Sequence, residues 1–307
     1  MNEPLWVERY RPSTVAGTIL TRDLQDVFRK FVDDKFVPNL ILSGGPGVGK
    51  TTIARAALEE IGCDYLFLNA SKIGIDNLRT DIETFASSMS LFGRKYVLFD
   101  EADKLTAATQ DALRGFIEEF SGTCGFIFTC NRPNRIIQPI HSRCVGVEFR
   151  IAGSPEVAGQ LLKRLIEILD AEGVEYEVPV LVELIQRFYP DMRRTINHLQ
   201  LSARRTGRID SGALSLSSST DVKELIDLMR AKDYTGMRQW VAAGSNLDQT
   251  ELYRALYDQA REHFKLERIP NVVLVLGKYQ FQASFAADPE INTMACLTEL
   301  LMEDVLK

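Results

Sequence analysis

The chain has 307 residues, of which 45% are hydrophobic and 25% charged, and its formal net charge is −6. This length predicts two or three domains, and the composition is that of a soluble globular protein without the ~18-residue apolar run that a membrane-spanning helix needs. The acidic balance argues against a chain that coats nucleic acid by itself, although a local basic face is compatible with it.

The N-terminal sequence, MNEPLWVERYRP, has no basic segment followed by an apolar one, so it does not resemble a secretory signal. We therefore expect a cytoplasmic protein that has no association with a membrane. The five cysteines are odd in number and include no CxxC pair, which argues against a disulfide framework and against a zinc module.

Five short apolar runs rich in β-forming residues lie in the first half of the chain, at 39–43, 64–69, 96–100, 125–130 and 145–149. Helix-like stretches separate these runs. Buried strands that alternate with amphipathic segments are typical of a parallel sheet covered on both faces, so the pattern predicts an α/β domain with a parallel five-stranded sheet.

After Arg150 the β-like runs end and apolar residues recur at helical spacing. The stretch SGALSLSSST at 211–220 is rich in Gly and Ser and is a candidate linker, and the helical pattern resumes after it. We therefore expect an α/β domain over 1–150, a small helical domain over 151–212 and an all-helical domain over 213–307.

The run GGPGVGKTT follows the first predicted strand and precedes a predicted helix, which is the context that a GxxxxGK[ST] phosphate-binding loop requires. Glycines let backbone N–H groups surround phosphates, while Lys50 reaches the β- and γ-phosphates and Thr51 binds Mg²⁺. The alternative is a Gly-rich turn, which this context disfavours. The expected ATP-binding residues of the loop are Gly45, Pro46, Gly47, Val48, Gly49, Lys50, Thr51 and Thr52.

YVLFDEAD places acidic residues at the carboxyl end of another predicted strand, where ligands bind in open parallel sheets. We expect Asp100 to bind Mg²⁺ and Glu101 to polarise the attacking water. Asp103 is equally well explained as part of a solvated acidic turn. Asn131 ends the next strand, where its amide is placed to contact the water or the γ-phosphate, or else forms a turn.

These motifs together resemble the ATPase subunits of sliding-clamp loaders, which belong to the AAA+ class. The resemblance covers nearly all of residues 3–205 and includes WVERYRP, the phosphate loop, LNASKIGID, DEAD, TCN, HSRC and DMRRTINHLQ. SRC together with ERYRP is similar to the replication factor C type. The short helical C-terminus resembles the T-even phage large subunit more than the bacterial loader. The resemblance implies an AAA+ domain, a helical lid and a helical collar for oligomerisation.

The resemblance also implies residue roles that spacing alone does not give. Arg143 resembles an arginine finger that reaches ATP bound to the neighbouring subunit, although a surface arginine in a loop has the same local appearance. Arg193 resembles the lid arginine that senses nucleotide in its own subunit. An N-terminal strap that packs on adenine corresponds to Val7, Glu8, Arg9, Tyr10 and Ile19, although Tyr10 also fits an ordinary core position.

Two further segments match regions that bind partners in this family. Met89, Leu91 and Phe92 would project from a loop and dock on the sliding clamp, unless they fill the core of their own domain. Lys72 lies near the start of a predicted helix and Arg79 lies on it, and this helix would face primer-template DNA. For either residue alone, a solvated helix face is the simpler explanation.

The implied machine is a five-membered spiral built from a homotetramer of this chain and one different loader subunit. ATP and Mg²⁺ hold the spiral and the clamp open, and hydrolysis stimulated by DNA and clamp releases the clamp on primer-template DNA. Two alternatives remain at this point. One is another AAA+ motor, such as a branch-migration helicase or an unfoldase, and the other is a scaffold that binds ATP without turnover.

Overall fold

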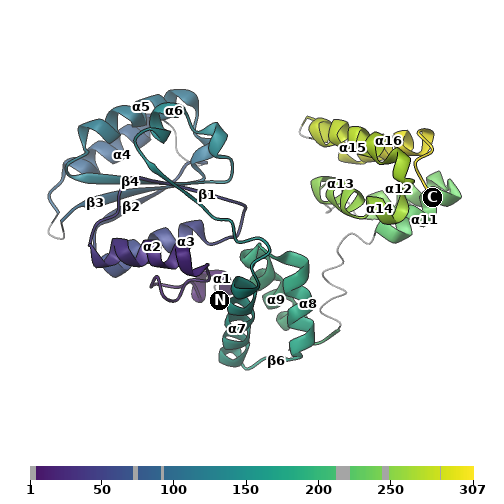
Figure 1. The fold of residues 1–307 in the computed structure, drawn as a ribbon, viewed down its shortest axis with the longest axis horizontal. Coiled ribbons are helices and arrows are strands. Elements are labelled where there is room, and N and C mark those ends of the chain that lie inside the picture. Colours follow the sequence, from purple (N-terminus) through teal and green to yellow (C-terminus); the bar gives the residue numbers. More distant parts are fainter. Residues whose placement is uncertain (1–4, 72–74, 91–92, 212–221, 244–248, 284) are drawn as a thin grey trace. The chain divides into compact units, whose positions relative to one another are not determined.

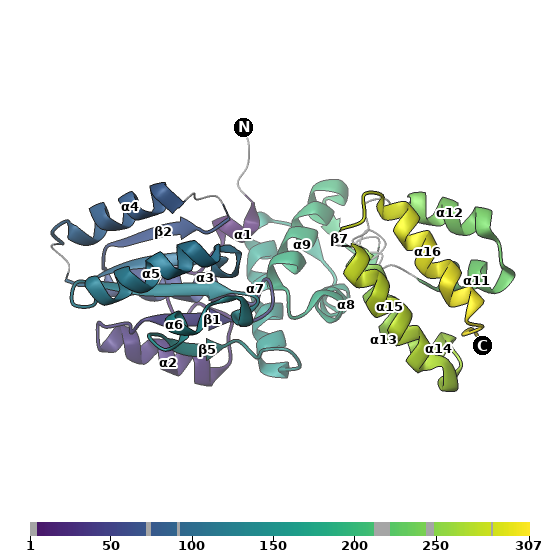
Figure 2. The ribbon, with the colours of Figure 1, turned by 90° about the horizontal axis from the view of Figure 1, so that it is seen from above.

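The computed structural model describes residues 1–307 apart from 1–4, 72–74, 91–92, 212–221, 244–248 and 284 (Figures 1 and 2). The chain divides into two compact units, Met1–Ser217 and Ser218–Lys307. Most of the linker predicted at 211–220 lies outside the described residues. In the part of the chain that is described, no helix is both long and apolar enough to cross a bilayer.

The first unit is built on a five-stranded parallel sheet with the strand order β2-β3-β4-β1-β5, which confirms the predicted architecture. Because β1 lies between β4 and β5, the loop that follows β1 emerges beside the carboxyl end of β4. The register pairs Ser43 with Cys130, and Asn69 with Asp100. The strands are β1 (Leu40–Ser43), β2 (Tyr65–Asn69), β3 (Lys95–Asp100), β4 (Cys124–Cys130) and β5 (Val145–Glu148).

Helices cover both faces of the sheet (Figure 1). The helices α2 (Arg22–Asp33) and α3 (Lys50–Ile61) pack on one face, and α4 (Ile75–Ser87) and α5 (Ala107–Glu119) on the other. A hydrophobic core lies on each face of the sheet. Side chains alternate along β1, so Leu40 and Leu42 belong to the first core and Ile41 belongs to the second. Short helical turns complete this domain: η1 (Ala102–Lys104), η2 (Pro133–Arg135) and α6 (Gln138–His141).

A helical subdomain follows β5 within the same unit and shares the first core, to which Leu161 and Leu199 contribute together with Leu40. The N-terminal helix α1 (Trp6–Arg9) packs against it: the backbone N–H of Trp6 donates to Gln200 Oε1 at 3.0 Å. The elements of the subdomain are α7 (Pro155–Glu172), β6 (Glu175–Tyr176), α8 (Val178–Phe188), α9 (Met192–Thr206) and β7 (Arg208–Ile209).

The second unit is helical around its own core, as the sequence pattern predicts. A polar contact lies inside that core, where the Asn292 amide donates to the Tyr253 hydroxyl at 3.0 Å. The described elements are α11 (Val222–Ala231), α12 (Tyr234–Ala243), α13 (Gln249–Asp258), α14 (Ala260–His263), η3 (Leu266–Arg268), α15 (Ile269–Ala283) and α16 (Pro289–Met302).

One buried hydroxyl links β3 to the chain before β1, and its removal should destabilise the first unit. The Tyr96 side chain is 1% exposed, and its hydroxyl accepts the Val37 N–H at 2.9 Å. Tyr96→Phe leaves that donor buried without a partner, so we expect the free energy of unfolding in urea to fall by about 1–3 kcal/mol. Tyr65→Phe is the control, because the Tyr65 hydroxyl bonds Glu59 at an exposed position and its loss should cost under about 0.5 kcal/mol. Equal effects of the two changes would contradict this account.

Candidate nucleotide-binding and catalytic site

The loop between β1 and α3 has the backbone of a phosphate cradle. Gly47 (φ 68°) and Gly49 (φ 93°) adopt left-handed conformations that side-chain-bearing residues rarely take. The 12-residue helix α3 begins at Lys50, directly after this loop. The free N–H groups at a helix start, together with inward-turned loop amides, form a site that favours anions such as phosphate.

Lys50 is held inside this loop by neutral acceptors. Its ammonium donates to the carbonyl oxygens of Gly44 at 2.9 Å and Gly45 at 2.5 Å, and to Asn131 Oδ1 at 2.9 Å. The residue is 8% exposed, and burial lowers the pKa of its ammonium, although acidic neighbours, including Asp100, act in the opposite direction. An arriving phosphate would therefore stabilise the charged form of Lys50.

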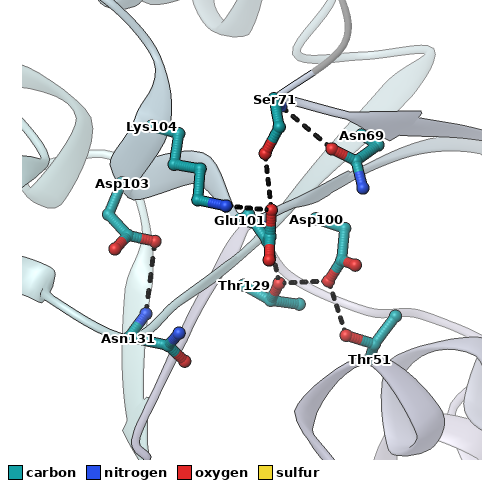
Figure 3. Close-up of polar contacts among 9 residues, drawn as sticks. All are labelled: Thr51, Asn69, Ser71, Asp100, Glu101, Asp103, Lys104, Thr129 and Asn131. Atoms are coloured by element: carbon teal, nitrogen blue, oxygen red, sulfur yellow. Dashed lines mark hydrogen bonds and ion pairs between the residues drawn. The ribbon is translucent and has the colours of Figure 1, made fainter. Parts of the chain in front are cut away.

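Thr51 and Asp100 meet at the carboxyl edge of the sheet (Figure 3). Asp100 Oδ1 accepts hydrogen bonds from the Thr51 hydroxyl at 2.5 Å and from the Thr129 hydroxyl at 2.7 Å. A hydroxyl and a carboxylate supply the hard oxygen ligands that Mg²⁺ uses together with substrate phosphates. The donor set therefore fits the metal site predicted from the sequence.

Glu101 lies beside Asp100 with an unusual backbone, at φ 57° and ψ 42°. A left-handed conformation at a non-glycine residue is a strained state that recurs at functional sites. Its Oε2 accepts the Ser71 hydroxyl at 2.5 Å and the Lys104 ammonium at 2.7 Å (Figure 3). Hydrogen bonds from Lys104 first and then from Ser71 lower the pKa of Glu101, so its carboxylate is ionised at neutral pH.

Backbone contacts connect the acidic turn to the end of β4. The Glu101 N–H donates to Thr129 Oγ1 at 3.2 Å, and the Asn131 N–H donates to Asp103 Oδ1 at 3.2 Å (Figure 3). Asp103 therefore orders the chain that carries Asn131. The parallel sheet thus brings Lys50 of the phosphate loop together with Asp100, Glu101 and Asn131 at the ends of β3 and β4.

A pocket opens between the N-terminal segment, the phosphate loop and the helical subdomain. Of the residues predicted to bind nucleotide, it is lined by Val7, Tyr10, Ile19, Gly47, Val48, Gly49, Lys50, Thr51, Thr52 and Arg193. Gly45 and Pro46 belong to the loop but are not among the lining residues. Glu8 and Arg9 are not lining residues either; Glu8 pairs with Arg11 at 2.5 Å, and Arg9 pairs with Glu172 at 2.8 Å.

Several lining residues were not predicted from the sequence: Trp6, Arg11, Pro12, Thr18, Leu20, Arg164, Met192 and Ile196. Trp6, Arg11 and Pro12 belong to the WVERYRP motif, which already indicated this region. Met192 and Ile196 likewise belong to the DMRRTINHLQ motif. Arg164 carries no such signal, because it lies on an amphipathic helix whose pattern reports only which face is buried. No role was predicted for Thr129, Ser71 or Lys104 either, although Thr129 lies in the TCN motif, Ser71 in LNASKIGID, and Lys104 directly after DEAD.

The helical subdomain contacts the phosphate loop directly. The Met192 N–H donates to the Gly47 carbonyl at 3.2 Å. Asp191 caps α9 by accepting the Arg194 N–H at 2.9 Å, and its carboxylate lies where a side chain at position 47 would be. The start of α9 is therefore fixed on the loop, and Arg193, the second residue of α9, lines the pocket.

This contact makes Gly47 sensitive to substitution. A Cβ at this position would lie 1.8 Å from Asp191 Oδ1, and the backbone φ of 68° already disfavours alanine. We expect Gly47→Ala to weaken ATP binding at least about tenfold, which is about 1.4 kcal/mol, because α9 must move off the loop. A titration with a fluorescent ATP analogue measures this effect.

Gly45→Ala is the matched control for that change, because a Cβ at position 45 would have the Val48 side chain as its nearest neighbour, at 3.8 Å. Its affinity for ATP should stay within about threefold of the wild type, since ordinary van der Waals contact costs little. An equal loss in both variants would mean that the subdomain contact does not determine the sensitivity of Gly47.

Arg143 does not line the pocket of its own chain. It lies between α6 and β5, where Nε donates to Glu118 Oε1 at 2.9 Å and Nη1 to the Pro139 carbonyl at 2.7 Å. Nη2 pairs with the same Glu118 oxygen, and this pair lowers the pKa of Glu118. The Arg143 side chain is 31% exposed, so part of it is accessible at the surface of the first unit.

The residues predicted to contact clamp and DNA are only partly described. Met89 follows α4 and is 99% exposed, so it does not fill the core of its own domain. Leu91, Phe92 and Lys72 lie outside the described residues. Arg79 lies on α4 and is exposed.

Two family models match the first unit. The model of the ATPase family associated with various cellular activities (AAA) matches residues 40–151, and that of the sliding-clamp-loader large subunit, AAA+ ATPase lid domain, matches residues 155–215. The chain is 32% identical to the sliding-clamp-loader large subunit of Escherichia phage RB69, over 98% of this chain and 97% of that protein. It is 30% identical to the sliding-clamp-loader large subunit of Enterobacteria phage T4, over 98% of this chain and 97% of that protein.

The replication factor C small subunit of Methanothermobacter thermautotrophicus is 32% identical, over 98% of each chain. Among solved structures, two mutants of RuvB from Thermotoga maritima superpose with TM-scores of 0.54 and 0.55 at 17% and 16% identity. The first superposition covers 67% of the present chain and 71% of the RuvB chain, and the second covers 82% and 81%, respectively. At such identity the RuvB likeness shows the fold alone.

Proposed function

We propose, for a chain that belongs to the AAA+ family of sliding-clamp-loader large subunits and replication factor C small subunits, that it is the ATP-hydrolysing subunit of a sliding-clamp loader. In this role it opens the processivity clamp of a DNA polymerase and places it on primer-template DNA. The observation that carries the proposal is the full-length relationship to loader subunits, joined to an intact set of P-loop and strand-end catalytic groups.

ATP would bind in the pocket between the phosphate loop and the lid. Loop amides and Lys50 would hold the phosphates, and Val7, Tyr10 and Ile19 would pack near the base. Mg²⁺, bound by Thr51 and Asp100, would neutralise charge on the β- and γ-phosphates. Arg193 enters the pocket from α9, so lid position and nucleotide contacts would change together.

Hydrolysis requires a group that takes a proton from the attacking water. Glu101 is ionised and lies at the same strand end as Asp100, which suits it to that task. Ser71 and Lys104 both donate to Oε2, so Oε1, which has no partner among the described residues, would accept the proton of the water. Asn131, which already contacts Lys50, would orient the water or the γ-phosphate.

The second half of the active site would come from a neighbouring subunit. Arg143 lies at the surface and does not line its own pocket, so it would reach ATP bound by the next chain in a spiral of four copies and one different subunit. ATP can favour the open spiral only by contacts that ADP lacks, and a guanidinium on the γ-phosphate is such a contact. Hydrolysis would then release the clamp on DNA.

Met89, Leu91 and Phe92 would dock on the clamp, and Lys72 and Arg79 would contact the DNA backbone. An exposed thioether suits a protein surface because methionine is flexible and polarizable. Basic groups on phosphates read duplex shape without sequence, which suits a loader that acts at any primer end.

Steady-state ATPase measurements test the proposal. The purified chain would be assayed alone, then with primer-template DNA, the sliding clamp encoded in the same genome and the accessory loader subunit. We expect slow turnover alone and at least about tenfold stimulation in the full mixture, because assembly completes the site. Turnover that ignores both DNA and clamp would contradict the loader role but leave an ATPase.

A further inference from the structure

Met89 is exposed to solvent between two residues that are anchored to the domain. The side chain of Met89 is 99% exposed, whereas Ser88 and Ser90 on either side of it form hydrogen bonds to β3 and to the start of β2. A methionine in a freely moving loop would not have fixed neighbours on both sides. The short segment Ser88 to Ser90 is therefore held at both ends.

The first anchor is the buried lysine at the beginning of β3. Lys95 is 3% exposed and forms no ion pair with any residue that the structure describes. Its ammonium instead donates to the Ser88 hydroxyl at 2.7 Å, and to the carbonyl oxygens of Phe85 and Ser88, and it lies 4.9 Å from the centre of the Phe85 ring. A cation here satisfies free carbonyls at the carboxyl end of α4 and interacts favourably with the helix dipole.

The second anchor is the residue before β2. The Ser90 hydroxyl donates to Asp64 Oδ2 at 2.9 Å. Asp64 is itself fixed, because its carbonyl accepts the Tyr96 N–H at 3.0 Å and so belongs to the sheet. Both anchors thus come from the edge of the sheet on the side of β2 and β3, at the amino ends of these strands.

We propose that the contacts Lys95–Ser88 and Asp64–Ser90 pre-organise the segment Ser88 to Ser90 and hold Met89 outward for docking on the sliding clamp. Lys95, Ser90 and Asp64 are positioning residues, since they act through Met89. This inference rests on the proposed clamp-loader function. Fixing a backbone residue costs conformational entropy, and a segment ordered before docking avoids that cost at binding.

A double-mutant cycle on clamp affinity tests the inference. The assembled loader with a slowly hydrolysed ATP analogue would be titrated with the fluorescently labelled clamp encoded in the same genome. We expect Met89→Ala to weaken binding at least about tenfold, and Ser90→Ala about three- to tenfold. In the Met89→Ala background, Ser90→Ala should cost little more, because there is no longer a side chain to position.

Controls separate positioning from general damage to the fold. Ser87→Ala is the matched control, since its hydroxyl is exposed and has no hydrogen-bond partner among the described residues. Asp64→Asn keeps an oxygen that accepts from Ser90 and should bind the clamp like the wild type, whereas Asp64→Ala should resemble Ser90→Ala. Lys95→Met should weaken binding to a similar extent, and ATP affinity should stay within about twofold in every variant.

The outcomes distinguish the inference from the function on which it rests. If Met89→Ala leaves clamp affinity unchanged, the docking role of this segment is wrong and the inference is lost with it. If Met89→Ala weakens binding but Ser90→Ala and Asp64→Ala do not, docking stands and pre-organisation is overturned. Equal losses from Ser90→Ala in the wild-type and Met89→Ala backgrounds would also overturn it.

Discussion

Replacing Glu101 with glutamine is expected to lower the ATP turnover number of the assembled loader at least about a hundredfold, because positioned proton transfer contributes roughly 10²–10⁴. The amide matches the carboxylate in size, and its oxygen still accepts from Ser71 and Lys104. The fold and the phosphate loop therefore stay intact. Affinity for ATP, measured with a fluorescent analogue, should remain within about threefold of the wild type.

Asp103→Asn is the matched control, since it makes the same chemical change two residues later. Asp103 accepts the Asn131 N–H, and an asparagine oxygen can still do so. We expect turnover to fall less than about fivefold, because one hydrogen bond to a charged acceptor is weakened but not lost. If Glu101→Gln retained near-normal turnover, or if the two variants were equally impaired, Glu101 would not be the group that activates water.

Arg143→Ala is expected to lower turnover in the assembled loader by about a thousandfold or more, the contribution of such arginines in P-loop enzymes. ATP binding by the separate chain should hardly change, because Arg143 does not line its own pocket. Arg135→Ala serves as the control, since this nearby side chain is exposed and forms no hydrogen bond with a described residue, whereas its backbone N–H and carbonyl bond Arg132 and Gln110.

Mixing variants gives a direct test of action between subunits. A chain with Arg143→Ala keeps its own Glu101, and a chain with Glu101→Gln keeps its own Arg143. Mixed assemblies therefore contain some interfaces where an intact arginine faces an intact glutamate, and turnover should recover partly. Assemblies that carry both substitutions in every chain should stay inactive. Absence of recovery on mixing would argue that Arg143 acts within its own chain or only supports the fold.

The fold class follows from sequence features that are local. Each strand is a short apolar run, and the five strands fall within two residues of the predicted ranges at either end. The runs are apolar on both faces, as in β1, because helices cover both sides of the sheet. The family, the AAA+ fold with its lid and the helical C-terminal region are likewise confirmed.

The catalytic pieces were also recognisable before their geometry was known. Gly47, Lys50 and Thr51 lie in one loop and helix start, and Asp100 and Glu101 at one strand end, so each group is ordered by a few neighbouring residues. That the two groups meet follows from the parallel sheet, whose carboxyl ends share one edge. The assignment of roles to these residues stays a prediction.

The sequence by itself thus determined the elements, their order and the motifs at strand ends, because hydrophobic periodicity and loop chemistry are properties of short segments. Only the tertiary structure decided contacts between distant segments. Trp6 donates a hydrogen bond to Gln200, 194 positions away, the first residue of α9 bonds the phosphate loop, and Arg143 pairs with Glu118. Such pairs depend on how helices pack and on which polar groups burial leaves to be satisfied, and no local pattern encodes either.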